Sequence, residues 1–171
     1  MSAATETSTI ASTPLLERPA LSELPVEHLV DLRVDLEPAK LIGTPTGALM
    51  VFIAQGGSFE GPRLSGEVVP GGGDWLRVGD DQLGRVDVRA MLRTHDGVLI
   101  DYSARGVIKI PADGLERLAA GERLPFEETY VRTTPKFETS DARYAWLNEL
   151  VIVGHNELSQ NHIDYRMYRV L

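Results

Sequence analysis

Apolar and polar residues alternate along most of this chain after Pro25, and this pattern limits the fold more than any other feature. Residues 84–94 are the clearest stretch: one face holds Val86, Val88, Ala90 and Leu92, and the other holds Asp87, Arg89, Met91 and Arg93. A period of two is the spacing of a β-strand that buries one face. The pattern predicts strands over residues 29–36, 48–55, 63–69, 84–94, 98–107, 128–134, 146–153 and 163–170.

One short helix and several turns complete the predicted secondary structure. Asp113 can cap a helix over residues 114–120 that ends at Gly121 and buries Leu115 and Leu118. The segment 94–97 ends in Asp-Gly, which favours a hairpin turn, and the polar run 154–161 is predicted to be a loop. About eight short strands joined by turns indicate an all-β antiparallel barrel or sandwich. An eight-stranded barrel holds side chains or one small ligand.

The length of 171 residues suits one domain. We expect residues 1–25 to form a disordered tail and residues 26–171 a single β-barrel domain. The chain carries no transmembrane run, no basic signal-type region and no cysteine, so we expect no membrane partner and a cytoplasmic location. The net charge of -8 argues against a nucleic-acid partner, which would need clustered Lys and Arg.

A glycine- and proline-rich segment, residues 56–75, places charged and aromatic residues beside special backbone positions. A loop there could hold Asp74 against the Trp75 indole at the barrel mouth, where burial would make the carboxyl an acid or base near neutral pH. Alternatively, Asp74 caps the loop and Trp75 plugs the barrel end. Similarly, Arg63 could bind a ligand carboxylate while Glu60 orients the Arg63 guanidinium. Alternatively, Glu60 and Arg63 could form a simple ion pair in a turn.

The polar faces of the predicted strands supply further candidates. Tyr130 and Arg132 share one face, and Trp146 and Asn148 share another; their large aromatic rings favour an inward orientation that would line a cup. Arg89 lies on a face that is expected to be solvated, so it joins this set as a weaker candidate. The histidines lack paired metal-ligand spacing, and the glycines match no phosphate or dinucleotide motif. We therefore predict no metal and no cofactor.

Several ordered motifs resemble one family of known sequences. They are Gly56-Gly57 with Phe59, Gly61-Pro62, Leu64, Gly66 and 70–75; Asp87-Val88-Arg89 with 92–94 and Asp96-Gly97; 130–135 with 137–139; and 144–148. Together they are similar to the uncharacterised bacterial and fungal family called domain of unknown function 3237, over roughly residues 29–171. The resemblance implies a calycin-like antiparallel β-barrel and an association with metabolism of small aromatic or other organic compounds. It implies no established reaction.

These observations predict a cofactor-free enzyme that performs acid–base chemistry of the lyase, isomerase or decarboxylase type. The catalytic candidates are Asp74, Glu60 and Tyr130, and the substrate-binding candidates are Arg63, Trp75, Arg89, Arg132, Trp146 and Asn148. The expected substrate is a small organic molecule, aromatic or anionic. The alternative is a lipocalin-like protein that binds such a molecule without changing it, and self-association into a homo-oligomer is left open.

Overall fold

The structure is a computed structural model that describes residues 21–171. The predicted disorder of residues 1–20 lies outside the described residues, and residues 21–25 are exposed ahead of the first strand. The elements are β1 (Val26–Leu36), β2 (Lys40–Thr44), β3 (Gly47–Glu60), β4 (Ser65–Val78), β5 (Gly84–Thr94), β6 (Leu99–Lys109), α1 (Gly114–Ala119), η1 (Phe126–Glu128), β7 (Tyr130–Glu138), η2 (Ala145–Glu149), β8 (Ile152–Leu158) and β9 (His162–Val170).

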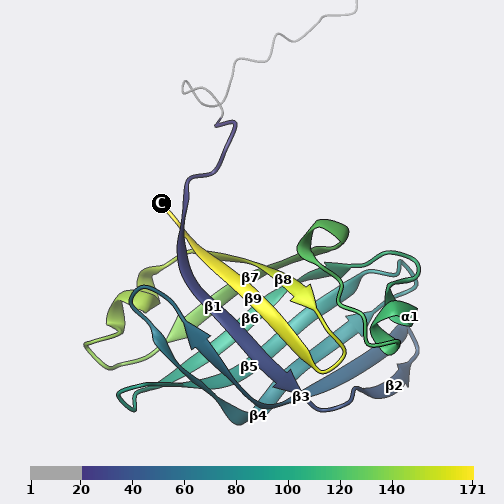
Figure 1. Cartoon of the computed structure of the whole chain (residues 1–171), viewed down its shortest axis with the longest axis horizontal. Helices are drawn as coiled ribbons and strands as arrows, with labels where there is room; N and C mark the ends of the chain where they lie inside the picture. The colour runs from purple at the N-terminus through teal and green to yellow at the C-terminus, as the bar shows by residue number, and fades with distance from the viewer. Residues whose placement is uncertain (1–20) are drawn as a thin grey trace, which may run out of the picture.

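The strands form one antiparallel sheet that closes on itself (Figure 1). The order is β1-β9-β8-β7-β6-β5-β4-β3-β2, and β1 also pairs with β3, for example Leu32 with Phe59. Eight strands therefore complete the barrel, while β2 extends the sheet beside the first half of β3. The predicted eight-stranded antiparallel barrel with one short helix is confirmed, and β2 is an addition that the sequence pattern did not predict.

The alternating sequence pattern matches the burial of the strands. Along β5, buried and exposed residues alternate without interruption from Gly84 to Thr94. Val30, Leu32 and Leu36 of β1 are also buried, as predicted. The inward side chains join a single large hydrophobic core inside the barrel. Period two thus places the core correctly wherever a strand has one apolar face.

Two predicted elements are wrong around residue 150. Residues 146–153 were expected to form a strand, but η2 occupies Ala145–Glu149 and buries Leu147 against the core. Most of the expected loop over 154–161 belongs instead to strand β8. The inward residues of β8 are small or apolar, apart from Asn156. Polar outward residues gave this strand the composition of a loop. The predicted burial of Leu115 is also wrong, because its side chain is 63% exposed while Leu118 is partly buried.

The glycine-rich residues 71–73 lie inside strand β4 rather than in a loop. Against β5, Val69 pairs with Met91 and Gly73 pairs with Arg89, so β4 holds two more residues than β5 between these pairs. Gly73 has a φ of 153°, and a Cβ there would collide with the main chain at Phe52. This β-bulge needs glycine, and it preserves the inward direction of the residues that follow it.

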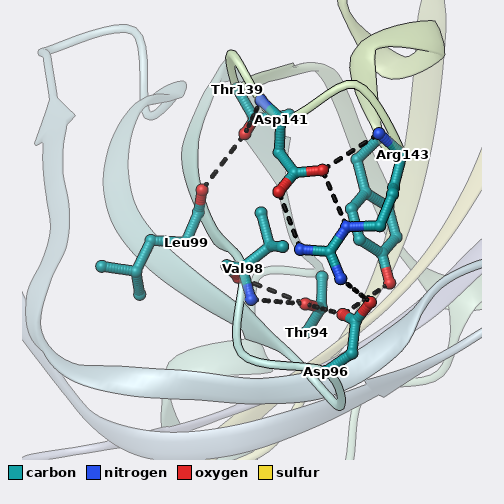
Figure 2. A network of polar contacts seen from close by, with 8 residues as sticks. Thr94, Asp96, Val98, Leu99, Thr139, Asp141 and Arg143 are labelled. Carbon is teal, nitrogen blue, oxygen red and sulfur yellow. Dashed lines mark hydrogen bonds and ion pairs between the residues drawn. The ribbon is translucent and has the colours of Figure 1, made fainter.

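One end of the barrel lies opposite α1 in Figure 1, and we call it the closed end because η2 buries Leu147 there against the core. Figure 2 shows part of the polar network that holds it together. Asp96, in the β5–β6 turn, accepts hydrogen bonds from Thr94, from the Tyr144 hydroxyl at 2.8 Å and from Arg143 at 2.7 Å. Asp141 binds the same guanidinium. These contacts join the β5–β6 hairpin to the segment that carries η2.

Candidate functional site

The opposite end of the barrel, where β4 and β6 terminate, is only partly covered, and we call it the open end. Six inward apolar side chains at this end pack against the core but remain partly exposed: Val34, Met50, Phe52, Val78, Ile108 and Ile163. A smaller cluster of Leu124, Val131 and Leu158, with Leu118 of α1 against it, covers part of this end. The open end is therefore an apolar approach to the barrel interior.

Asp74 points into the barrel beneath this approach. It pairs directly with Phe52 on β3 and with Val88 on β5, and directly paired residues of antiparallel strands share a face. Its side chain is buried, with a relative exposure of 5%, and no other charged residue in the described part of the chain is buried. Its Oδ1 accepts a 3.0 Å hydrogen bond from the Asp87 backbone N–H.

The electrostatic environment of Asp74 suits proton transfer near neutral pH. Burial raises the pKa of this carboxyl from its ordinary value of 3.8 to about 6, although the hydrogen bond from the Asp87 N–H opposes the shift. Protonated and ionised forms are thus both populated at mildly acidic pH. A carboxyl of this kind can accept and return a proton under physiological conditions.

Polar side chains from other strands share the interior with Asp74. Tyr102 and Tyr165 are buried, and burial together with the Asp74 charge raises the pKa of both hydroxyls, so they remain protonated donors. The Tyr102 hydroxyl, the Thr133 hydroxyl and the Asn156 Oδ1 have no hydrogen-bond partner among the described residues. An unpaired buried polar group of this type costs about 1–3 kcal/mol. Sequence reasoning missed four inward residues: Tyr102, Thr133, Asn156 and Tyr165. The alternation of residues 98–107 does, however, place Tyr102 on an inward face.

Trp75 and Arg89 do not join Asp74. Trp75 follows Asp74 in β4 and therefore faces outward, with 38% of its surface exposed. Arg89 pairs with Gly73 on the exposed face of β5. The predicted indole wall beside the carboxyl is wrong because Asp74 belongs to a strand, in which neighbouring residues point to opposite faces.

The predicted inward orientation of Tyr130 and Arg132 is also wrong. The inward positions of β7 belong to Val131, Thr133 and the alternate residues beyond them, while Tyr130 is 55% exposed. The Arg132 guanidinium lies 4.4 Å from the Phe126 ring centroid and 4.8 Å from that of Tyr130. The Tyr130 ring thus packs against the Arg132 guanidinium on the outer wall instead of lining the interior.

Arg63, Trp146 and Asn148 lie together at the closed end, remote from the open end. The Arg63 guanidinium is 4.1 Å from the Trp146 ring centroid, and Trp146 packs partly against the core. Asn148 is exposed and exchanges two hydrogen bonds with the backbone of Thr139. Trp146 and Asn148 therefore lie in η2 rather than on a strand face that lines a cup.

Glu60 lines a cleft of about 470 Å³ on the outer wall of the barrel, across β3, β1, β9 and β8. The arginines of this cleft are engaged by neighbouring acids: Arg33 by Asp164 and Arg166 by Asp31, and Arg123 by Glu157. Glu60 pairs with Asp31 across the strands. Glu60 and Asp74 thus occupy opposite sides of the barrel wall and cannot act on one small molecule together.

Within residues 21–171, no group of three or more His, Asp or Glu side chains is arranged to hold a metal ion. None of the helices in the same range is both long and apolar enough to cross a membrane.

Comparison with known proteins connects this barrel to one family. Residues 24–170 match the family described as "Protein of unknown function (DUF3237)". The chain belongs to this family. An UPF0311 protein of Rhodopseudomonas palustris strain TIE-1 is 28% identical over 137 residues, covering 80% of this chain and 88% of that protein. An UPF0311 protein of Clostridium acetobutylicum is 26% identical, covering 88% of this chain and 96% of that protein.

Solved structures share the fold. A β-barrel-like protein from Acinetobacter baumannii is 31% identical, with a TM-score of 0.74, and the match covers 91% of this chain and all of that one. A Rhodopseudomonas palustris protein of unknown function reaches a TM-score of 0.82 at 24% identity, over 88% of this chain and all of that one. A protein described as an enzyme from Penicillium herquei has a TM-score of 0.67 at 21% identity, over 92% of this chain and all of that one.

Proposed function

We propose that this protein is a cofactor-free acid–base enzyme whose site is the barrel interior below the open end. Asp74 is the group that accepts a proton from the substrate and later returns it. The single observation that carries the proposal is the burial of this one carboxyl, with a pKa raised to about 6, beneath an approach lined by apolar side chains. The substrate is a small organic molecule that enters through the open end.

The chemistry follows from the groups that share the interior. Asp74 as carboxylate removes a proton from a carbon next to a carbonyl, and the electron pair of the broken C–H bond moves onto the carbonyl oxygen. The hydroxyls of Tyr102 and Tyr165, kept protonated by burial, are the donors available to stabilise that oxygen. Return of the proton to the same or another carbon completes an exchange or isomerisation that needs no co-reactant.

Two further observations favour this function. Apolar surroundings raise the basicity of a carboxylate, and the core around Asp74 is mainly aliphatic and aromatic. A barrel of the same fold is described as an enzyme, which agrees with a catalytic use of this architecture. The predicted roles of Glu60 and Tyr130 find no support, because both lie outside the barrel. The cytoplasmic location remains a prediction.

The test uses 2-tetralone, a neutral aromatic ketone with exchangeable protons beside its carbonyl. The full-length protein is incubated with it in D₂O, and deuterium incorporation is followed by mass spectrometry from pH 5 to 8. We expect exchange faster than in buffer, with a rate that rises through an apparent pKa near 6. Asp74→Asn should reduce the protein-catalysed rate at least tenfold, because an amide cannot accept the proton.

The matched control is Asp101→Asn, which removes an exposed carboxyl from the outer face of β6 and should leave the rate unchanged. Exchange at the buffer rate with wild-type protein would contradict the proposal and favour a binding protein without catalysis. Equal rates for wild type and Asp74→Asn would remove this carboxyl from the chemistry.

A further inference from the structure

We propose that this protein forms a symmetric dimer in which strand β2 of one copy pairs antiparallel with β2 of a second copy. The partner is another molecule of this chain, and the contact is the free edge of the barrel sheet at the open end. The proposal concerns assembly, so it does not depend on the role of Asp74. It rests on the unpaired main chain of β2, on the shape of its two faces and on its charge.

Strand β2 has one unpaired edge. It continues the line of β1 along β3, because Leu36 pairs with Ala54 and Lys40 pairs with Val51. Strand β9 covers the other edge of β1 but pairs no further along this line than Asp35. Within residues 21–171, β2 therefore pairs with β3 alone. Figure 1 shows β2 at the same end of the barrel as α1.

The geometry of the β2–β3 hairpin shows which main-chain groups point to this free edge. Thr44 and Gly47 flank a two-residue turn, and residues in this position exchange both of their main-chain hydrogen bonds. Hydrogen-bonded pairs alternate along an antiparallel ladder, so Ile42 bonds to β3 while Leu41 and Gly43 direct their N–H and C=O groups outward. None of these outward groups has a partner among the described residues. Four unpaired groups thus line the edge, and such an edge can pair with another strand.

These four groups are self-complementary about a two-fold axis at Ile42. If Ile42 lies opposite Ile42 of the second copy, Leu41 lies opposite Gly43 in both halves of the contact. Each of these two pairs exchanges two hydrogen bonds, so every free group of both strands is satisfied. A two-fold axis at Gly43 would instead place Leu41 opposite Pro45, which has no N–H to donate. The main chain therefore favours the register centred on Ile42.

The side chains of β2 fit the same register. Leu41 is 71% exposed, and a Cβ at Gly43 would have nothing within 4 Å. The Leu41 side chain of each copy would lie in this open space beside Gly43 of the other. On the opposite face, Ile42 is 50% exposed, and its Cβ would approach that of its counterpart to about 4.5–5.5 Å. Both apolar side chains would then be shielded from water.

The charge of β2 is compatible with self-association. Lys40 is the single charged residue of this strand, and its ammonium group binds Glu37 at 3.0 Å. The register places Lys40 opposite Thr44 of the second copy. The two Lys40 residues are then about 13 Å apart along the strand direction, which exceeds the screening length of about 8 Å at physiological salt.

The second copy would also extend the open end of the barrel. Leu41 pairs directly with Met50, which is one of the apolar side chains at that end, and directly paired residues share a face. Leu41 of the second copy, beside Gly43, would continue the same apolar rim. A contact made by one short strand from each copy belongs to the class of reversible interfaces that bury less than about 1,200 Å². We therefore expect the dimer to dissociate on dilution.

The experiment is sedimentation velocity of the full-length protein from about 1 µM to about 500 µM, a range in which small interfaces dissociate. Wild type should shift from monomer towards dimer. Ile42→Lys should remain monomeric throughout, because it places two ammonium groups directly opposite each other. The matched control is Leu99→Lys, which adds the same charge at a residue of β6 that is 55% exposed at the closed end. This control should associate as wild type does.

A mixing experiment tests the two-fold register itself. Ile42→Glu should also be monomeric alone, whereas an equimolar mixture of Ile42→Lys and Ile42→Glu should associate, because opposite charges then face each other across the axis. A mixture that stays monomeric while wild type dimerises would overturn the proposal. Wild-type protein that remains monomeric at the highest concentration would do the same, as would loss of association in Leu99→Lys.

Hydrogen exchange of wild type at the two ends of the concentration range locates the contact. The amides of Leu41 and Gly43 should exchange several-fold more slowly in the concentrated sample, because each gains a hydrogen bond to the second copy. Association with unchanged exchange at both amides would mean that the dimer uses another surface, and the proposal would then be wrong.

Discussion

The raised pKa of Asp74 makes a prediction about stability that needs no substrate. A buried carboxyl with a pKa above its unfolded value binds its proton more tightly in the folded state, so folding is favoured where the group is protonated. The Asp74 contribution is therefore fully present below pH 3.8 and is lost as the pH rises through about 6. At about 1.4 kcal/mol per pKa unit, the whole change is about 3 kcal/mol.

Most of this change in the free energy of unfolding falls in an experimentally convenient pH range. From pH 4.5 to pH 8, the titration of Asp74 should lower the free energy of unfolding by about 2 kcal/mol. Asp74→Asn removes the titration while keeping an oxygen that can accept the hydrogen bond from the Asp87 N–H. We expect the free energy of unfolding of wild type, relative to Asp74→Asn, to fall by about 2 kcal/mol from pH 4.5 to pH 8.

The assay is urea unfolding of both proteins at several pH values, followed by circular dichroism. With an m-value of about 2 kcal/mol/M, the gap between the two midpoints should change by about 1 M in favour of the variant as the pH rises. Comparing the two proteins cancels the titration of all other carboxyls. A gap that stays constant with pH, or changes in the opposite direction, would refute the assignment of the raised pKa to Asp74.

Two further predictions concern the framework around the site. Gly73→Ala should lower the free energy of unfolding by about 3 kcal/mol or more, because Gly73 has a positive φ and the new Cβ would collide with the main chain of Phe52. The matched control is Gly43→Ala, where nothing lies within 4 Å of the added Cβ. This control should change the melting temperature little. Asn148→Ala should lower the free energy of unfolding by about 1–3 kcal/mol, since two hydrogen bonds to Thr139 are lost. Unchanged urea midpoints for Asn148→Ala would show that these two hydrogen bonds do not stabilise η2.

The barrel could be predicted from the sequence because strand alternation depends on burial and not on which strands pair. Residues 84–94 show this most clearly, since Val86, Val88, Ala90 and Leu92 are buried and the residues between them are exposed. The burial of the Asp74 carboxyl could also be predicted, although its setting differs from the one expected. The glycines before it indicated a special backbone, but they form a bulge within β4 rather than a loop.

The rest of the site could not be predicted because alternation defines two faces without saying which one is inside. The aromatic ring of Tyr130 suggested that its face of 130–134 points inward, whereas Val131 and Thr133 occupy the interior. The ring of Tyr130 is exposed and lies under the Arg132 guanidinium, an arrangement that the pattern of residues does not reveal. The inward polar residues Thr133 and Asn156 are small and uncharged, so nothing in the sequence distinguishes them from ordinary strand residues.

The sign of a stability change distinguishes function from structure in this barrel. A polar group kept for packing is paired, as Asp96 is at the closed end, and its removal weakens the fold. Asp74 at neutral pH and the unpaired Tyr102 hydroxyl do the opposite, because each is a desolvated group whose removal relieves the folded state. Groups that reduce stability are retained where a ligand or a reaction uses them. The paired polar groups and these desolvated groups should therefore respond to substitution with opposite signs.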